Sequence, residues 1–259
     1  MTIPTEPTVP TVPIVVCGRS GRMARLIAGA IAGAPDLSLT GRLTLRPAPV
    51  SAPAPVPGEP GAHSGGAPLV GGLKELAGPP PVVVDFTARE ATAALLRQAV
   101  ETPCPLVIGT SGLGDAEREL IAEVGRHTPV VAAANFSLAL LAVARFAEDL
   151  SRITDDSWDA GVLDIHFAGK LDRPSATARF LAGRWQGARG AGEGREPDVA
   201  SFRMGNGVSE HRLVAAGTGE HVEVLHRVAD RTAFLPGVLR SVRFAARARP
   251  GVYTLEDVA

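Results

Sequence analysis

A histidine and a lysine four positions apart, followed by a proline and two hydroxyl side chains, are the residues of this sequence best suited to chemistry. The segment is H-F-A-G-K-L-D-R-P-S-A-T-A, residues 166–178, and it contains His166 and Lys170. A histidine can titrate near neutral pH, and a lysine supplies a compact cation. The proline, followed by Ser175 and Thr177, is typical of a turn that opens a helix, where backbone N–H groups can hold a carboxylate. The same residues also fit an ordinary strand-to-helix connection with an exposed lysine and a serine cap.

A glycine turn lies between a short apolar run and a helical repeat near the start of the chain. The apolar run is P-I-V-V-C at 13–17, and the turn that follows it consists of Gly18, Arg19, Ser20, Gly21, Arg22 and Met23. The apolar residues after the turn recur at helical spacing. A strand, glycine turn and helix in this order can hold a pyrophosphate on the backbone N–H groups at the helix start. The spacing is not the complete dinucleotide fingerprint, so a plain tight turn is the alternative.

The second predicted strand, residues 37–45, does not end in an acidic residue that could bind a ribose hydroxyl. Arg42 and Arg46 lie in that region instead. Arginines at this place favour NADPH over NADH, because a guanidinium can accommodate a 2′-phosphate. They also fit ordinary surface arginines.

Strands that alternate with helices continue as far as residue 136 and predict a parallel sheet covered on both faces. The further strands are predicted at 81–86, 106–108 and 130–132, and the helices at 88–100 and 115–124. The carboxyl ends of such strands meet at one edge of a sheet, where ligands bind. The polar and small residues at those ends are Phe86 and Thr87, then Gly109, Thr110 and Ser111, then Ala133, Ala134, Asn135 and Phe136. Residues 46–68 are rich in Pro, Ala and Gly and are predicted to form a loop.

A different pattern begins after residue 137. Helices are predicted at 138–150 and 176–185, a strand at 161–167, a Gly/Arg-rich loop at 187–194 and a last helix at 234–247. The segments 199–204, 212–216 and 221–226 alternate apolar and polar residues, as antiparallel strands with one solvated face do. The predicted fold is therefore α/β, with an N-terminal Rossmann-like doubly wound parallel sheet and a second α+β domain built on an open mixed sheet. The predicted boundaries are a disordered tail at 1–12, a dinucleotide-binding domain at 13–136 plus 232–259, and a second domain at 137–231.

Composition excludes several classes of function. The chain has 259 residues and a formal net charge of −1, so no global field indicates nucleic acid or an anionic membrane surface as a partner. No apolar run reaches the roughly 20 residues of a membrane-spanning helix, and we expect a soluble cytoplasmic protein. Cys17 and Cys104 lie in apolar runs and are expected to be free buried thiols. We predict no metal site: His211, His221 and His226 are expected to be satisfied by neighbours or to face solvent, as histidines in strands usually are.

The order of five motifs resembles the dihydrodipicolinate reductase family. These motifs are G-R-S-G-R-M, D-F-T, G-T-S-G, A-N-F-S and H-x-x-x-K-x-D-x-P-S-x-T-A. The closing G-V-Y-T-L-E-D-V is also similar to the end of that family, whereas residues 46–72 and 187–197 do not align. The resemblance implies reduction of a cyclic conjugated imine with two carboxylates, using NADPH or NADH, in lysine and diaminopimelate biosynthesis. It also implies a homotetramer that assembles through the second domain, which would bind substrate.

The resemblance also assigns roles to residues. Residues 18–23 would hold the cofactor pyrophosphate, and the strand-end residues named above would flank the nicotinamide; Arg231 would serve the cofactor or the joint between domains. Lys170 would be the proton donor, and its charge would favour the electron-rich transition state, while His166 would orient the ring or share the proton. The turn at Ser175, Ala176 and Thr177 would grip a substrate carboxylate.

Two positions depart from the family pattern. Phe167 stands where the family has a second histidine, so one polar partner for a dicarboxylate is missing. Ala176 stands where the family has a glycine, and its methyl group would crowd a ligand or exclude a positive φ if the turn needs one. These departures keep open a reductase for another cyclic imine or unsaturated carboxylate. A catalytically silent nucleotide-binding regulator is the third hypothesis, against which the presence of both His166 and Lys170 argues.

Overall fold

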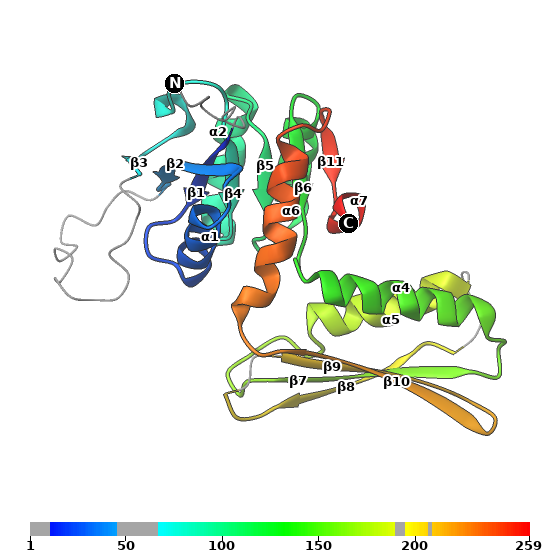
Figure 1. The fold of residues 1–259 in the computed structure, drawn as a ribbon. Helices are drawn as coiled ribbons and strands as arrows, with labels where there is room; N and C mark the ends of the chain where they lie inside the picture. Colours follow the sequence, from blue (N-terminus) through cyan, green and yellow to red (C-terminus); the bar gives the residue numbers. More distant parts are fainter. Residues whose placement is uncertain (1–10, 46–66, 190–194, 207–208) are drawn as a thin grey trace, which may run out of the picture. The chain divides into compact units, whose positions relative to one another are not determined.

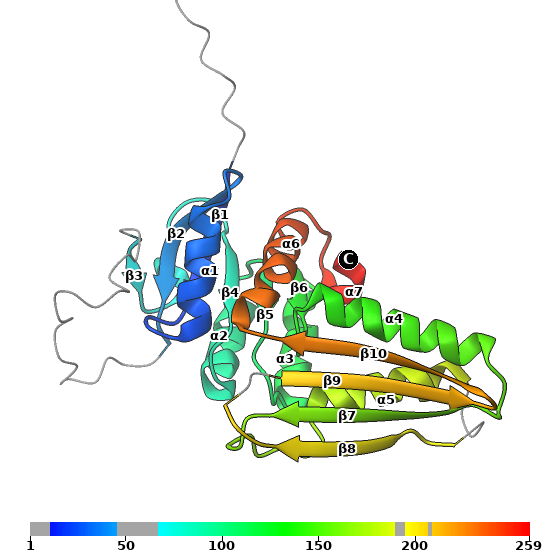
Figure 2. The same cartoon turned by 60° about the horizontal axis from the view of Figure 1, so that its bottom comes forward.

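The computed structural model describes residues 11–45, 67–189, 195–206 and 209–259. The chain forms two compact units, one made of Met1–Phe136 with Leu235–Ala259 and the other of Ser137–Phe234. Figures 1 and 2 show the elements of both units from two directions. Residues 46–66 and 190–194 of the predicted loops, and residues 1–10 of the predicted tail, lie outside the described residues. The rest of two of these predictions is wrong: residues 187–189 are the end of the helix α5 (Ala176–Arg189), and Val12 begins the strand β1 (Val12–Cys17). Among the described helices, none combines the length and the apolar character that crossing a bilayer requires.

The first unit is built on a seven-stranded sheet in which every neighbouring pair of strands is parallel. The strands are β1 (Val12–Cys17), β2 (Leu37–Leu43), β3 (Leu69–Val70), β4 (Val82–Asp85), β5 (Leu106–Ile108), β6 (Pro129–Ala132) and β11 (Gly251–Tyr253). Their order is β11-β6-β5-β4-β1-β2-β3, so the direction of winding reverses between β1 and β4. Ligands of open α/β sheets bind beyond the carboxyl ends of the strands at such a reversal. The predicted parallel sheet is confirmed; β3 and β11 are additions to it.

Helices cover both faces of this sheet, as its apolar strands require. They are α1 (Arg22–Ala32), α2 (Arg89–Glu101), α3 (Asp115–Gly125), α6 (Leu235–Ala245) and α7 (Leu255–Val258), with a short 3-10 turn, η1, at Leu73–Glu75. The helices α1 and α6 pack against each other, as do α2 and α3. Buried residues on the side of α2 and α3 include Leu95, Leu96, Ile121 and Val124. Each such side chain contributes about 1.5–3 kcal/mol when it is fully removed from water.

The second unit is a four-stranded mixed sheet with two helices on one face (Figure 1). Its strands are β7 (Asp159–His166), β8 (Asp198–Arg203), β9 (Ser209–Gly217) and β10 (Glu220–Val228), in the order β10-β9-β7-β8. The helices are α4 (Leu138–Ile153) and α5 (Ala176–Arg189), and a 3-10 turn, η2, spans Arg231–Phe234. The antiparallel arrangement predicted for three strands holds for β9 and β10.

The prediction is wrong for β8, which pairs in parallel with β7. The reason is the connection: α5 lies between β7 and β8 in the sequence, and a strand that returns through a crossover helix runs in parallel with the first. Alternation of apolar and polar residues along a strand indicates only that one face of the sheet is solvated. It is the same whether the strand pairs in parallel or antiparallel.

The helix-covered face and the open face of this sheet differ in their side chains. Beneath the helices, Leu181 and Trp185 are fully buried and pack near Val162 and Ala215 of the sheet. On the opposite face, no helix of the described part of the chain covers the sheet, and Phe202 and Leu225 are 53% and 47% exposed. The open face therefore carries apolar surface that the described residues of the second unit leave exposed.

Candidate active site

The glycine turn after β1 has the geometry of a phosphate-binding turn. Gly18 has φ +94°, a value that an L side chain rarely adopts, and its N–H donates to the Leu43 carbonyl at 2.8 Å. Gly21 is the N-cap of α1 and offers no side-chain acceptor to the first turn of that helix. The predicted residues around it are largely open to solvent: Arg19, Ser20, Gly21 and Arg22 are exposed, and Met23 is half-buried. Backbone N–H groups at the α1 start are thus accessible to an anion.

Arg42 is not a surface arginine. Arg42 is 5% exposed, and its Nη1 donates a hydrogen bond to the Gly18 carbonyl at 3.3 Å. Burial lowers the pKa of this guanidinium. Arg42 therefore fastens the end of β2 to the glycine turn, whereas Arg46 lies outside the described residues.

A buried carboxylate joins the ends of β4 and β5. Asp85 has no exposed surface; its Oδ1 accepts the Thr87 N–H at 3.1 Å and the Thr87 hydroxyl at 2.6 Å, and its Oδ2 accepts the Thr92 hydroxyl at 2.5 Å. The Thr110 Oγ1 lies 2.8 Å from that of Thr92 and 3.5 Å from Asp85 Oδ2. Burial raises the pKa of Asp85, and the threonine hydrogen bonds oppose that rise. Thr87 and Thr110, both predicted cofactor ligands, use their hydroxyls here to shape the two turns.

Two aromatic rings fill the space behind the same sheet edge. The ring centroids of Phe86 and Phe136 are 5.1 Å apart. A Cβ at Gly109 would lie 2.1 Å from the Phe86 ring, so only glycine admits that ring. Phe136 is 1% exposed, and its side chain belongs to the core. Among the other predicted residues, Ser111 and Ala134 are exposed and Ala133 and Asn135 are half-buried.

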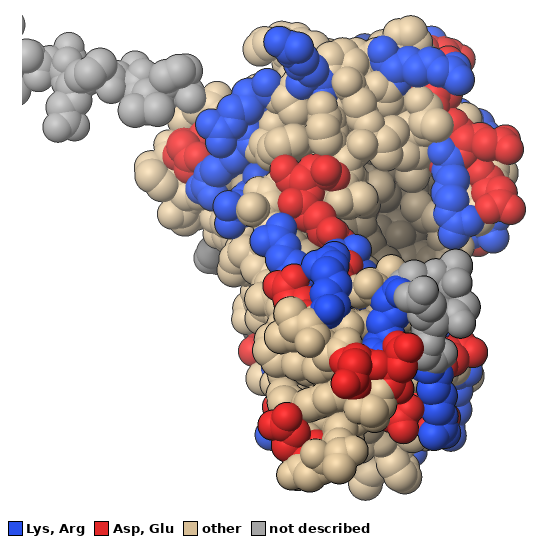
Figure 3. Space-filling view, turned by 90° about the vertical axis from the view of Figure 1, so that its right-hand side faces the viewer, with Lys and Arg blue, Asp and Glu red and all other residues tan. Residues whose placement is uncertain are grey.

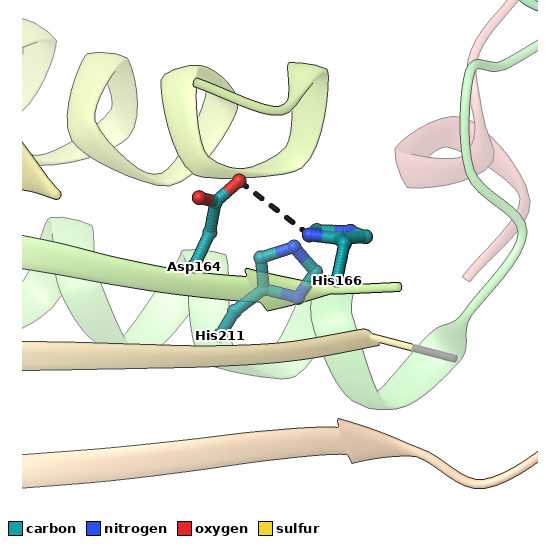
Figure 4. Close-up of side chains that lie close together, drawn as sticks. All are labelled: Asp164, His166 and His211. Carbon is teal, nitrogen blue, oxygen red and sulfur yellow. Dashed lines mark ion pairs between the residues drawn. The ribbon is translucent and has the colours of Figure 1, made fainter. Parts of the chain in front are cut away.

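In the second unit, the end of β7 carries a buried acid and a buried imidazole (Figure 4). Asp164 is fully buried and His166 is 7% exposed. His166 Nδ1 lies 3.6 Å from Asp164 Oδ2, which is longer than a hydrogen bond. Asp164 also accepts the Ser175 N–H at 2.8 Å and Arg203 Nη1 at 3.2 Å. Burial favours the protonated acid, but these and other donors outweigh it and hold the pKa of Asp164 well below its ordinary value.

His211 and His226 join this cluster, and each is buried with a serine hydroxyl near its Nε2 rather than facing solvent. Their exposed fractions are 2% and 7%. The centroids of His166 and His211 are 5.1 Å apart, and those of His211 and His226 are 6.0 Å apart. In the sheet, Asp164 pairs with His211 and His211 with His226, so the three side chains form a row across β7, β9 and β10. The alternation in β9 could have placed His211 on the apolar face, but the sequence does not give the register.

Serine caps of both covering helices contact this row. The Ser175 Oγ accepts the Ala178 N–H at the start of α5 and lies 3.4 Å from His211 Nε2. The Ser137 Oγ caps α4 and lies 3.2 Å from His226 Nε2. Burial, followed by the neighbouring histidines, lowers the pKa of His211 to about 3. Burial also lowers the pKa values of His166 and His226, and Lys170 adds to the effect on His166. All three rings are therefore neutral at neutral pH.

Asp164, His166 and His211 could in principle ligate a metal, because one ligand atom of each lies within 4.8 Å of the others. The charges around them oppose it. The Arg203 guanidinium already neutralises Asp164, and Lys170 adds a second positive charge nearby. We assign no metal to this cluster.

The loop from β7 to α5 places Lys170 beside His166. The Lys170 Nζ lies 2.7 Å from Asp172 Oδ1, and the Lys170 N–H donates to the Phe167 carbonyl at 3.1 Å. Phe167 is 43% exposed. Ala176 is the first residue of α5, and among the described residues only glycines have positive φ, so the turn does not require glycine there. Arg231 is half-buried and lies in η2, within the second unit.

Comparison with known proteins identifies the family. The model for the N-terminus of dihydrodipicolinate reductase matches residues 12–136, and the model for its C-terminus matches residues 139–259. The 4-hydroxy-tetrahydrodipicolinate reductase of Rubrobacter xylanophilus is 33% identical over 267 residues, covering 93% of this chain and 95% of the relative. That of Paraburkholderia phymatum is 30% identical over 260 residues, covering 93% and 96%.

Solved structures show the same fold. Dipicolinate-bound dihydrodipicolinate reductase from Paenisporosarcina sp. TG-14 superposes with a TM-score of 0.77 at 19% identity, covering 96% of this chain and all of that one. GenD2 from gentamicin A biosynthesis, in complex with NAD, gives a TM-score of 0.64 at 13% identity, covering 100% and 93%. From the two family models and the curated relatives, the chain belongs to the dihydrodipicolinate reductase family and is an NAD(P)H-dependent oxidoreductase of lysine and diaminopimelate biosynthesis.

Proposed function

We propose that the catalytic residues of this reductase are Lys170 and His166 and that its substrate is a cyclic conjugated imine with two carboxylates. The observation that carries the proposal is the end of β7, where a buried neutral imidazole, a lysine and the start of α5 share one loop. The ordered motifs of the chain match a family that reduces such a ring. A lysine cation beside a helix start is also the chemistry that a dicarboxylate needs.

The first unit fits a nicotinamide dinucleotide. The positive φ of Gly18 and the uncapped start of α1 suit a pyrophosphate, and the exposed Arg19 and Arg22 supply cations beside it. The turns that Asp85 fastens would hold the nicotinamide end. When bound, the cofactor supplies the hydride. The residues of this chain position it and shield it from water.

Lys170 would deliver the proton that the reaction requires. Hydride adds to one carbon of the conjugated ring system and a proton to the adjacent ring carbon, so a cation near the ring both donates and stabilises developing negative charge. His166 is a poor acid at neutral pH because burial lowers its pKa. It would orient the ring through a neutral imidazole.

Fewer groups of the turn at 175–177 are available to bind a substrate carboxylate than the motif indicates. The Ser175 N–H is taken by Asp164, its hydroxyl caps α5, and the residue is 2% exposed. Ser175 would therefore fix the turn, while the more accessible Ala176 and Thr177 would present backbone N–H groups to the substrate. The methyl group of Ala176 would lie beside that carboxylate.

Surface features support the remaining parts of the proposal. Acidic and basic side chains are interspersed on the face shown in Figure 3, which suits a small ligand better than a polyanion. Both cysteines are buried and unpaired, which supports a reducing cytoplasmic environment. The apolar open face of the second-unit sheet supports assembly, and we propose a homotetramer formed through it.

A second candidate is reduction of a related ring with one polar group fewer. Phe167 motivates it, because this exposed ring stands beside His166 and can neither donate a hydrogen bond nor carry charge.

The test is steady-state oxidation of NADPH and NADH by the purified protein with freshly generated cyclic imine dicarboxylate. We expect turnover with at least one nicotinamide. Failure with both would contradict the proposal, and turnover only of imines that lack one carboxylate would favour the second candidate.

A further inference from the structure

We propose that Asp172 is an internal competitor of the substrate: its carboxylate occupies the place of a substrate carboxylate and must be displaced when the substrate binds. The inference rests on the proposed function, because it takes Lys170 and the start of α5 as the substrate's binding groups. It adds a residue that sets how tightly a dicarboxylate is held.

The partners of Asp172 are those that an incoming carboxylate would use. Its Oδ1 lies 2.7 Å from the Lys170 Nζ. Its carboxylate also accepts the backbone N–H of Ala176, the first residue of α5. A cation on one side and a helix-start N–H on the other are the interactions that bind a free carboxylate. Two carboxylates cannot occupy the same donors without repulsion between like charges.

Asp172 is ionised at neutral pH. Burial favours its protonated form, but the hydrogen bond from Lys170 and the positive charge of that lysine lower the pKa of the carboxyl below its ordinary value. The side chain of Asp172 is 43% exposed, so it has room to rotate toward solvent.

The backbone around Asp172 is held independently of its side chain. Arg203 donates to the Asp172 carbonyl, and the preceding turn is closed by the Lys170 N–H on the Phe167 carbonyl at 3.1 Å. The Ala168 N–H donates to the Gly205 carbonyl at 3.0 Å. Rotation of one side chain therefore releases Lys170 and the Ala176 N–H without rebuilding the loop.

The decisive experiment measures inhibition of the holoenzyme by pyridine-2,6-dicarboxylate, a planar dicarboxylate, in wild type and in Asp172→Asn. Asparagine keeps an acceptor oxygen for the Ala176 N–H and removes the charge. We expect the inhibition constant to fall about threefold to tenfold, the scale of a partly exposed charge interaction. The dissociation constant of NADPH is expected to stay unchanged.

Asp149→Asn is the matched control. Asp149 pairs with Arg152 at 2.9 Å on the exposed side of α4, so this variant changes the net charge equally at a place remote from the loop. It should leave the inhibition constant unchanged. A fall of the same size in Asp149→Asn would mean that net charge is responsible and would overturn the inference.

The remaining outcomes separate the inference from the function on which it rests. If wild type neither turns over the imine nor binds the dicarboxylate, the proposed function fails and the inference with it. If wild type does both but Asp172→Asn binds the dicarboxylate as wild type does, or more weakly, only the inference is overturned. Weaker binding would show that Asp172 holds Lys170 in place for the substrate. Asp172→Ser, with a short neutral acceptor, repeats the test if the amide variant does not fold.

Discussion

Individual residues of the two candidate sites divide into those that can meet a ligand and those that fasten them. Lys170 and Ala176 are accessible to solvent. Asp164 and Asp85 are fully buried, and their carboxylate oxygens accept hydrogen bonds from backbone and side-chain donors. A buried carboxylate that is satisfied by several donors is costly to disturb, because removing one partner leaves the other unsatisfied. Mutation of a positioning residue is therefore expected to impair the site as much as mutation of the group that it positions.

Phe167 offers a test of substrate choice at a single residue. Replacing it with histidine adds a donor next to His166 and should lower the KM for a dicarboxylate imine about tenfold or more, because a hydrogen bond to a charged group contributes about 1.5–3 kcal/mol. Steady-state kinetics measures the change. Phe146→His on α4, where Phe146 is 40% exposed, is the matched control and should leave KM as it is. An unchanged KM in Phe167→His would show that this position does not face the substrate.

His211 makes stability depend on pH. Its pKa is about 3 in the folded protein, against an ordinary value of 6.5, so below pH 6.5 the unfolded chain binds a proton that the folded protein does not. Stability is then lost as pH falls from about 6.5 toward 3, and the loss between pH 7 and pH 5 amounts to about 2 kcal/mol. Urea unfolding at both pH values should show that His211→Gln, which cannot titrate, loses about that much less than wild type. Equal losses would mean that His211 is charged in the folded state.

Among the elements, the ends of β4 and β5 depend on one buried network. Thr92→Val removes the hydroxyl that lies between Asp85 and Thr110 and should lower the free energy of unfolding by about 1–3 kcal/mol. NADPH binding should weaken with it, because both turns lose their fastening. Thr92→Ser keeps the hydroxyl and is the matched control. Denaturant unfolding and cofactor fluorescence measure the two effects; loss of stability in Thr92→Val without weaker NADPH binding would separate the network from the cofactor.

The helices and strands also show which parts of the structure could be predicted from the sequence. Long periodic segments such as 138–150 predict their helices because one apolar face must be buried. The two-residue β3 and three-residue β11 are too short for periodicity to reveal. His166 and Lys170 could be singled out because they are neighbours in sequence, whereas His211 and His226 reach His166 only through strand register. Register depends on pairing across the sheet, which is a property of the folded chain.

At the scale of the whole molecule, we propose that the open apolar face of the second-unit sheet is an interface of the homotetramer that the family resemblance implies. Wild type should have a mass in solution about four times that of the 26.7 kDa chain. The double variant Phe202→Asp, Leu225→Asp places charges on the exposed apolar face and should reduce that mass, because buried unpaired charges are costly. Light scattering after size exclusion gives the mass, and circular dichroism checks the fold. A wild-type monomer would refute the tetramer, and an unchanged mass in the variant would place its interface elsewhere.

In the proposed function, the first unit holds the hydride donor and the second unit holds the substrate. Folding gives each unit its own binding chemistry: a glycine turn and helix start in the first, a lysine, a neutral imidazole and a second helix start in the second. Such a division separates the two kinds of binding experimentally. A substitution of a catalytic residue in the second unit should abolish or reduce turnover of the imine, while the affinity of the protein for the cofactor stays unchanged.

The most direct measurement of this claim is the turnover number of Lys170→Met beside that of Lys74→Met, the variant of the other lysine in the sequence. Lys74 is exposed on the first unit and pairs with Glu101. With the cyclic imine dicarboxylate at saturation, Lys170→Met should lose about 10²–10⁴-fold in kcat, the usual contribution of a positioned acid, and retain the wild-type Kd for NADPH. Lys74→Met should match wild type in both. A Lys170→Met enzyme that turns over at the wild-type rate would contradict the account.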